Sequence, residues 1–441
     1  MAAAGDDSPR RVRPRCDDGS GGSSGGDGSG NNAVAGDAAV PLLVVLLAGN
    51  PATAAAIMGC IISKDTRALR RLHPAVAATV AGVPWNDGMA RIMDVVRWRA
   101  ALPAAVSAWL GRLPSQREQV AAAVAALQGV THLDLRMCSG TTDAMLLRLP
   151  RSLRDLNVSG IMKGGSRLTD DASFLHLACL ETLDCSFTAV LKDVGAGRLP
   201  RSLRQLCIDS CEVAATASFR HLRSLRELSC QQAPLSRATI ATLPPTLEEL
   251  DVSFMRSYLS AGVSLAHLTQ LRVLRATYST LDNATLAALP PSLQVLELGA
   301  CDNMTRAATF AHLGSLKFLG VNRTTCFGKA SLDSLPPSLE SLSAQGCEGL
   351  THASVLPHLP ALRELDVSNN SIGAPLVASL PPSLVKLRIN SCYRLDGELI
   401  SLDHLPLLRE LQHAHTSLPP AVLAACRARG CVVLDVVPKE E

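Results

Sequence analysis

Aromatic residues are scarce in this chain of 441 residues, which contains seven Phe, three Trp and three Tyr. An interior so poor in rings has to be filled by Leu, Ala, Val and Ile, which pack well in repeated layers. Long apolar runs are also missing. The longest, over residues 40–48, has about half of the ~20 residues that a membrane-spanning helix requires, so we expect no membrane span and no membrane partner.

Charge of one sign is not in excess either. The formal net charge is +3, and bulk electrostatics therefore does not favour a nucleic acid or an anionic membrane as the ligand. The apolar run follows a polar tail that contains Asp6, Asp7, Asp17 and Asp18, which is unlike the positively charged leader of a secretory signal. We expect a cytoplasmic protein.

Motifs for catalysis and cofactor binding are absent from the sequence. There is no His-Glu-x-x-His zinc motif, no Gly-x-x-x-x-Gly-Lys-Ser/Thr phosphate loop and no Gly-x-Gly-x-x-Gly after a strand-like segment. No nucleophile is accompanied by a recognisable base. We therefore predict no enzyme activity and no cofactor.

What the chain does contain is a repeat. Between Leu153 and Leu408 the spacing Leu-x-x-Leu occurs twelve times, in two flavours that alternate strictly. One flavour reads Leu-Pro-Arg/Pro-Ser/Thr-Leu, as in residues 289–293, and the other reads x-His-Leu-x-x-Leu, as in residues 311–316. The paired period is about 45 residues, and self-similarity at such a period is typical of a solenoid.

Aligning the repeats gives one apolar residue per unit at steps of 22 to 27 residues. These aligned residues are Val130, Leu153, Leu180, Leu203, Leu225, Leu247, Leu271, Leu293, Leu316, Leu339, Leu362, Leu384, Leu408 and Cys431. The positions three and five later are also apolar, as in Leu206 and Ile208 after Leu203. This spacing predicts one short strand per coil in a parallel sheet, with turns or short helices opposite. The fold class is an α/β solenoid, a horseshoe with a concave sheet.

The chain divides into three predicted parts. Residues 1–39 form a disordered tail rich in Gly and Ser. Residues 40–126 have apolar residues at helical spacing, with expected helices over residues 88–101 and from Ser115, where Glu118 would complete a capping box. We interpret this part as a helical N-terminal cap. Residues 127–438 form the solenoid of about 14 coils, including a C-terminal cap.

Cysteine and histidine recur at fixed places in the repeat. Five of the fourteen cysteines lie eight residues after an aligned residue, namely Cys138, Cys211, Cys301, Cys347 and Cys392. Residues two coils apart are separated by about 10 Å, too far for a disulfide. Six histidines recur every second coil, so they cannot share one zinc ion. We predict structural cysteines, histidines in turns, and no metal.

The positions two, four and six after each aligned residue should face outward from the sheet and form its concave wall. They are mainly acidic in the first six coils and become apolar in the next three, with Lys386 and Arg388 further on. The predicted partner-binding residues are Asp155, Asp184, Asp209, Glu227, Glu249, Asp251, Val273, Arg275, Val295 and Phe318. Such a wall suits a protein or peptide with complementary charge and an apolar anchor, and its acidic half disfavours nucleic acid.

The unit Leu-x-x-Leu-x-Leu-x-x-Cys/Asn/Thr, as in residues 203–211 and 362–370, resembles the leucine-rich-repeat superfamily over about 70 per cent of the chain. Its alternating Leu-Pro-Pro-Ser-Leu flavour is similar to leucine-rich-repeat families of protists. This resemblance implies a scaffold for protein–protein interaction, and we expect a monomer. A tight enzyme inhibitor of the ribonuclease-inhibitor kind is a further hypothesis, but it needs several concave aromatic residues, and Phe318 is the only one at the mapped positions.

A second resemblance concerns the N-terminal helices. Residues 40–43, then Asp65, Leu69, Leu72 and Val76, then Trp85, follow the order of an F-box. That resemblance implies docking on a Skp1-type adaptor and a role as substrate receptor of a cullin-type ubiquitin ligase. The sequence departs from the F-box pattern in two respects. The tryptophan lies nine residues after the valine, and no acidic residue follows Pro41.

Overall fold

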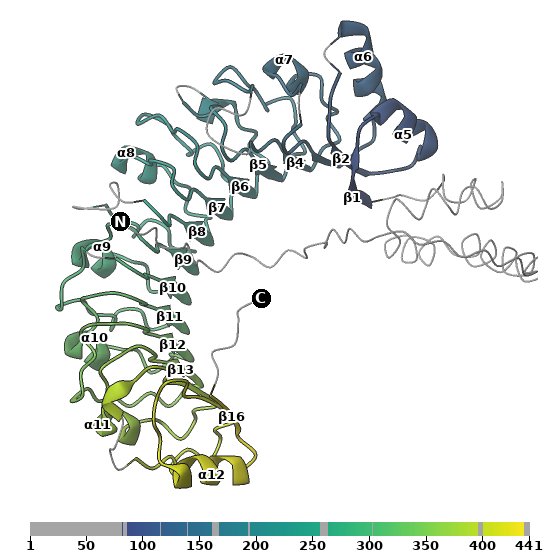
Figure 1. Cartoon of the computed structure of the whole chain (residues 1–441). Coiled ribbons are helices and arrows are strands. Elements are labelled where there is room, and N and C mark those ends of the chain that lie inside the picture. Colours follow the sequence, from purple (N-terminus) through teal and green to yellow (C-terminus); the bar gives the residue numbers. More distant parts are fainter. Residues whose placement is uncertain are drawn as a thin grey trace, which may run out of the picture.

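One parallel sheet runs through the part of the protein that the structure describes. This structure, a computed structural model, describes residues 82, 86–114, 116–138, 140–160, 167–192, 195–255, 263–301, 303–395 and 400–435. Within them, 16 strands pair in chain order, each with the next. Figure 1 shows the resulting horseshoe, with strands along the inner side and helices on the outer side. The predicted α/β solenoid with a concave sheet is confirmed.

The strands are short because each coil contributes only the segment around its central leucine. They are β1 Asn86–Ile92, β2 Ser107–Leu110, β3 His132–Asp134, β4 Asp155–Asn157, β5 Thr182–Asp184, β6 Gln205–Cys207, β7 Glu227–Ser229, β8 Glu249–Asp251, β9 Val273–Arg275, β10 Val295–Glu297, β11 Phe318–Gly320, β12 Ser341–Ser343, β13 Glu364–Asp366, β14 Lys386–Arg388, β15 Glu410–Gln412 and β16 Val432–Leu434.

The helices of the outer side are mostly single turns. They are α5 Val95–Ala101, α6 Arg117–Ala126, α7 Asp143–Leu146, η1 Gly195–Arg198, α8 Arg237–Ile240, α9 Asn283–Ala287, α10 Lys329–Asp333, α11 Ala374–Ala378, η2 Tyr393–Leu395 and α12 Pro420–Ala428. None of the described helices has the length and apolar composition needed to cross a membrane.

The core is a ladder of leucines. The middle residue of every strand from β3 to β15 is a leucine with an exposed fraction of 2% or less. The aligned leucines from Leu153 to Leu384 are fully buried. Burying one such side chain stabilises the fold by about 1.5–3 kcal/mol relative to exposure. Because every coil repeats the pattern, the core is continuous and needs few aromatic rings.

The two flavours of repeat are explained by hydrogen bonds that join coils in pairs. The Ser or Thr before the aligned leucine of each Leu-Pro unit donates its hydroxyl to the carbonyl of the aligned residue in the preceding coil. The six donors are Ser152, Ser202, Thr246, Ser292, Ser338 and Ser383, at 2.7–2.8 Å from their acceptors. In return, the N–H of Phe310 donates to the Ser334 hydroxyl of the following coil, 3.0 Å away. The 45-residue period is therefore one bonded pair of coils.

The residue eight positions after the aligned leucine points inward and binds backbone groups, as predicted for the cysteines. The Cys347 thiol lies 3.0 Å from the Val321 carbonyl, and the Cys301 thiol lies 3.0 Å from the Ala276 carbonyl. The amide of Asn370 fills the same position in another coil. The cysteines in the described ranges form no disulfide with one another.

The sheet begins earlier than the sequence analysis predicted. Residues 88–101 are not one helix, because the first part belongs to strand β1 and only residues 95–101 form α5. The helix predicted from Ser115 exists as α6, with Gln116 as its N-cap and no side-chain cap from that residue. Ser115 lies outside the described residues, so the capping box stays a prediction. Strands β1 and β2 pair with each other and then with β3. The predicted boundary at residue 126 is therefore no break in the sheet.

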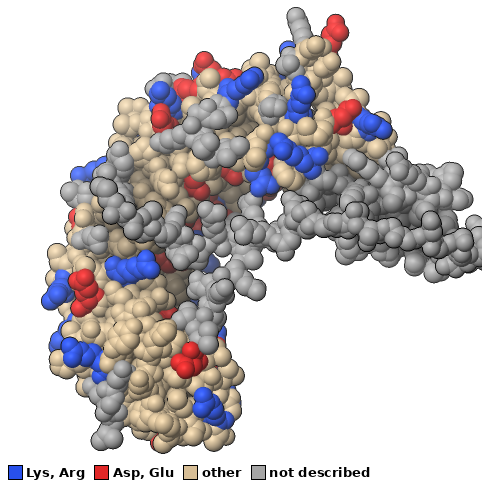
Figure 2. Space-filling view, in the orientation of Figure 1, with Lys and Arg blue, Asp and Glu red and all other residues tan. Residues whose placement is uncertain are grey.

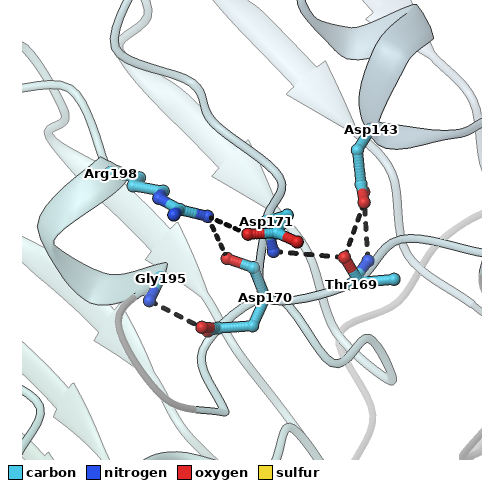
Figure 3. A network of polar contacts seen from close by, with 6 residues as sticks. All are labelled: Asp143, Thr169, Asp170, Asp171, Gly195 and Arg198. Carbon is cyan, nitrogen blue, oxygen red and sulfur yellow. Dashed lines mark hydrogen bonds and ion pairs between the residues drawn. The ribbon is translucent and has the colours of Figure 1, made fainter.

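A polar network ties three successive coils together on the outer side (Figure 3). The Asp143 carboxylate accepts hydrogen bonds from the Thr169 hydroxyl at 2.6 Å and the Thr169 N–H at 3.0 Å. The next loop is attached to η1, because Asp170 accepts from the Gly195 N–H at 2.9 Å and Arg198 donates to the Asp170 carbonyl at 2.6 Å. A Cβ on Gly195 would lie 1.5 Å from a backbone oxygen, so only glycine fits there.

Candidate functional site

The strand register places the predicted partner-binding residues in rows along the concave wall. Five of them occupy the first position of five adjacent strands, β7 to β11, and face each other in order: Glu227, Glu249, Val273, Val295 and Phe318. We call this set the first row. Residues that span about 90 positions of the chain thus lie side by side in this row, as their spacing in the repeat predicted.

A second row lies at the third position of the strands. It includes Asp184 of β5, Asp251 of β8 and Arg275 of β9. Asp209 lies two residues after the end of β6, and Asp155 begins β4, farther along the wall. All ten predicted side chains are half-buried. Their binding role stays a prediction, because geometry alone shows only that they share one wall.

The aspartates of this wall are partly engaged inside the protein, which the sequence map did not show. One carboxylate oxygen of Asp251 accepts the N–H of Ser253, two residues later, at 3.0 Å, and the other accepts the Gln231 amide at 2.7 Å. Asp184 accepts the N–H and hydroxyl of Ser186 in the same way. These aspartates therefore also close the turn that ends the strand.

Electrostatic crowding marks the acidic half of the wall. Burial raises the pKa of the Asp155 carboxyl, and the neighbouring Asp134 and Asp184 raise it further, against an opposing effect of His132. Burial also raises the pKa of Asp209, with a contribution from Asp251 and despite several hydrogen bonds to its carboxylate. A cationic group placed over these carboxylates would favour their charged forms and so lower the pKa of both Asp155 and Asp209.

Arg275 does not stand alone, because two glutamates flank it. Its guanidinium lies 3.6 Å from the Glu249 carboxylate and 3.5 Å from that of Glu297. The sequence analysis missed Glu297, although its position four residues after Leu293 marked it as part of the wall. Burial raises the pKa of Glu297, while Arg275 opposes this. The centre of the wall therefore keeps a negative charge in excess.

The apolar part of the first row has one fixed aromatic ring. A Cβ built on Gly320 would lie 3.3 Å from the Phe318 ring and 3.6 Å from the Glu297 side chain. The glycine thus leaves room for the ring beside its own strand. Val295 and Val273 extend this apolar surface over two neighbouring strands.

The expected basic zone is neutralised. Lys386 lies 3.0 Å from Glu364 on the adjacent strand, and the Arg388 guanidinium lies 4.0 Å from Glu410. The sequence map did not count these glutamates. Figure 2 shows charges of both signs scattered over the face of the molecule turned to the viewer.

The sequence analysis also missed two aromatic residues next to the wall. Phe254 and Tyr278 lie seven positions after Leu247 and Leu271, directly beyond the mapped positions, and their rings stack with centroids 5.2 Å apart. Both are half-buried. The signal that could have found them is the recurrence of the repeat, because adjacent coils place equivalent residues side by side.

The site offers binding groups and no prepared nucleophile. The thiol of Cys207 lies on the wall, but burial and the adjacent carboxylates of Asp209 and Asp184 raise its pKa to about 12. Such a thiol stays protonated at neutral pH and is a poor nucleophile. Among the described residues, no group of three or more His, Cys, Asp or Glu side chains could hold a metal ion.

No protein family profile and no curated protein sequence matches the chain. Among solved structures, it is similar to TLR13 in complex with ssRNA13, with a TM-score of 0.57 and 19% identity over 78% of this chain and 53% of that chain. This likeness confirms the fold. The chain spans only about half the length of that TLR13 chain.

Two bacterial proteins are similar at lower scores. They are an internalin from Listeria monocytogenes, with a TM-score of 0.44 and 17% identity over 66% of this chain and 82% of that one, and YopM from Yersinia enterocolitica, with a TM-score of 0.43 and 24% identity over 66% and 58%. At these identities, the ligand of another protein cannot be transferred to this one.

Proposed function

We propose that this leucine-rich-repeat protein is a non-catalytic scaffold that binds another protein on its concave wall. The observation that carries the proposal is the first row, where two glutamates and three apolar residues follow one another across five paired strands. An apolar anchor beside an excess of negative charge is the composition that gives a protein interface both affinity and specificity.

Protein is favoured over nucleic acid because of the sign of the charge. The TLR13 structure contains RNA, but here the wall carries Asp155, Asp184, Asp209, Glu227 and Glu249 in neighbouring coils. A phosphate backbone would be repelled by these carboxylates. Glu227 and Glu249 lie at paired positions of adjacent strands and repel each other. Lysines or arginines of a partner would instead be attracted to both.

The test compares what the full chain and two variants retain from extracts of the source cells. Glu227→Gln combined with Glu249→Gln removes both charges of the first row without adding bulk. Asp333→Asn is the matched control, since this carboxylate lies on α10 of the outer side, paired with Lys329. We expect partners that the wild type and the control retain and the double variant loses. Identical partner sets for all three would exclude the acidic part of the wall.

The adaptor-docking alternative stays a prediction. Residues 40–85, apart from Gly82, lie outside the described residues, and residues 86–126 form the first two strands and helices of the solenoid. A truncation that removes the candidate docking segment should therefore begin at Asn86 and keep β1. Loss of an adaptor and a cullin-type protein upon this truncation would support the substrate-receptor role, and unchanged partners would exclude it.

A further inference from the structure

Phe254 and Tyr278 form a pair of parallel rings where β8 and β9 end. The ring planes differ by only 10°, with centroids 5.2 Å apart. The backbone under each ring is fixed to the next coil, because the Phe254 N–H donates to the Thr277 carbonyl and the Tyr278 N–H to the Gly299 carbonyl, both at 2.7 Å. Two half-buried, stacked rings thus lie beside the concave wall, on backbone that is bonded to the next coil.

The backbone conformation does not call for aromatic residues at these positions. Phe254 and Tyr278 have φ of +62° and +55°, in the left-handed region that favours Gly and Asn. Other coils place Gly346 and Asn369 at the equivalent position, with φ of +60° and +58°. The repeat therefore works with residues that suit this backbone better. Most other coils also place a residue other than glycine there with positive φ, so the conformation belongs to the repeat, and two adjacent rings are what sets these two coils apart.

The charge around the pair points to the ligand. Asp251 precedes Phe254 by three residues, and Arg275, which precedes Tyr278 by three, lies between Glu249 and Glu297. Glu249, Asp251 and Glu297 thus give this part of the wall three carboxylates. The Arg275 guanidinium is their one positive counterpart. An aromatic face next to carboxylates attracts a cation, and a planar guanidinium both stacks on a ring and pairs with a carboxylate.

We propose that Phe254 and Tyr278 form a platform for an arginine side chain of the partner, whose basic segment lies over the acidic part of the concave wall. The inference rests on the proposed function and specifies the chemistry of the partner. Val273 lies in the same coil as Tyr278, and Val295 and Phe318 lie in the next two coils, so the same segment can place an apolar side chain there. The platform would select arginine over lysine, because lysine lacks the planar group.

The test uses fluorescence anisotropy with the full chain and three fluorescein-labelled probes. These are a dodecapeptide of alternating arginine and serine, the same peptide with lysine, and a single-stranded RNA of twelve nucleotides. We expect the arginine peptide to bind at least threefold more tightly than the lysine peptide, with affinity that decreases as salt increases. Equal binding of the two peptides, no saturable binding of either, or tighter binding of the RNA overturns the proposal.

Substitutions separate the platform from the wall. Phe254→Asn and Tyr278→Asn should each weaken arginine-peptide binding about two- to fivefold, the range expected for one exposed cation–π contact. Their melting temperatures should not fall, since Asn suits the left-handed backbone, and Tyr278→Phe should keep full binding. Phe187→Asn is the control, because Phe187 has the same conformation, with φ of +59°, and stacks on no ring among the residues that the structure describes.

The outcomes for the platform and for the proposed function can be told apart. If Glu227→Gln with Glu249→Gln abolishes peptide binding but neither ring variant changes it, the wall binds and the platform is wrong. An equal loss for Phe187→Asn would also contradict the pair as a distinct site. If the arginine peptide binds as expected while the double glutamine variant retains every cellular partner, the platform survives and the proposed use of the acidic wall fails.

Discussion

At the scale of single residues, this fold depends on polar groups that replace missing backbone partners. Asn370 is the clearest case. Its amide nitrogen donates to the carbonyls of Ala344 at 2.7 Å and Val367 at 2.8 Å, and its oxygen accepts the Cys347 N–H at 2.7 Å. The side chain is 6% exposed, so water cannot easily replace these bonds.

Asn370→Ala should therefore destabilise its coil by about 2–4 kcal/mol, because several buried polar groups lose their partners. Asn370→Thr is the matched control. In another coil, Thr416 accepts the Cys392 N–H at 2.8 Å and donates to the Ile389 carbonyl at 2.6 Å, so threonine should recover about half of the loss. Hydrogen exchange of the Cys347 amide measures the loss in the alanine variant and the recovery in the threonine variant. Equal exchange in the alanine variant and the wild type would contradict this role.

The carboxyl of Asp155 has the opposite character, because the fold disfavours its charge. Its pKa is raised in the native state, so its contribution to stability is complete below the unfolded-state pKa, near 4, and is lost as pH rises through the native value. Asp155→Asn should accordingly be more stable than the wild type at pH 7, by less than about 1 kcal/mol for this half-exposed group.

This advantage should disappear as the pH falls below the ordinary range for aspartate. Denaturant unfolding at neutral and acidic pH would measure the difference, with Asp333→Asn as an exposed carboxylate for comparison. A gain for Asp155→Asn that is the same at both pH values would show that its charge is not the cause.

At the scale of the element, the working unit is the pair of coils. Ser338 donates to the Leu316 carbonyl at 2.8 Å, and Ser334 accepts the Phe310 N–H at 3.0 Å. Both bonds join the same two coils. The two flavours therefore have different roles. The Leu-Pro coil supplies the hydroxyls, and the His-Leu coil supplies the backbone groups that bond to them.

Replacing Ser334 and Ser338 together with alanine should weaken this junction by about 2 kcal/mol, at about 1 kcal/mol for each hydrogen bond. The effect should appear as faster hydrogen exchange over residues 310–339, because stability in a solenoid is a sum over neighbouring repeats. Ser341→Ala, on the concave face of the same coil, serves as the control and should leave exchange unchanged. Uniform destabilisation of all coils would contradict a local role.

At the scale of the whole molecule, the open ends of the sheet decide solubility. Strand β16 covers β15, and the preceding coil contains Leu405 and Leu411, which are at most 1% exposed. Removing residues 417–441 would take away α12 and β16 together. An apolar layer and an unpaired strand edge would then face water, which favours association between copies.

We expect this truncated chain to aggregate when followed by light scattering during size-exclusion chromatography. The full chain carrying Val432→Lys should remain monodisperse, since Val432 is already 56% exposed on the edge strand and an edge lysine opposes pairing. A monodisperse truncated chain would show that the last coil does not act as a cap.

Sequence periodicity was enough to predict the rows of the concave wall, because the repeat fixes which side chains alternate between core and solvent. Glu227, Val295 and Phe318 lie in one row for this reason. Periodicity did not predict the first two strands, because residues 86–126 lack the repeat, and their helical spacing concealed β1 and β2. The F-box resemblance of the preceding residues has no structural test among the described residues.

The horseshoe, the leucine core and the inward cysteines can be predicted from the sequence, since each depends on a local spacing that recurs every coil. How charges are shared across coils is visible only in the folded protein. There, Arg275 lies between Glu249 and Glu297, Lys386 is paired with Glu364, and Phe254 stacks on Tyr278. These contacts join residues more than 20 positions apart, and side-chain geometry between neighbouring coils, which no local spacing specifies, determines them.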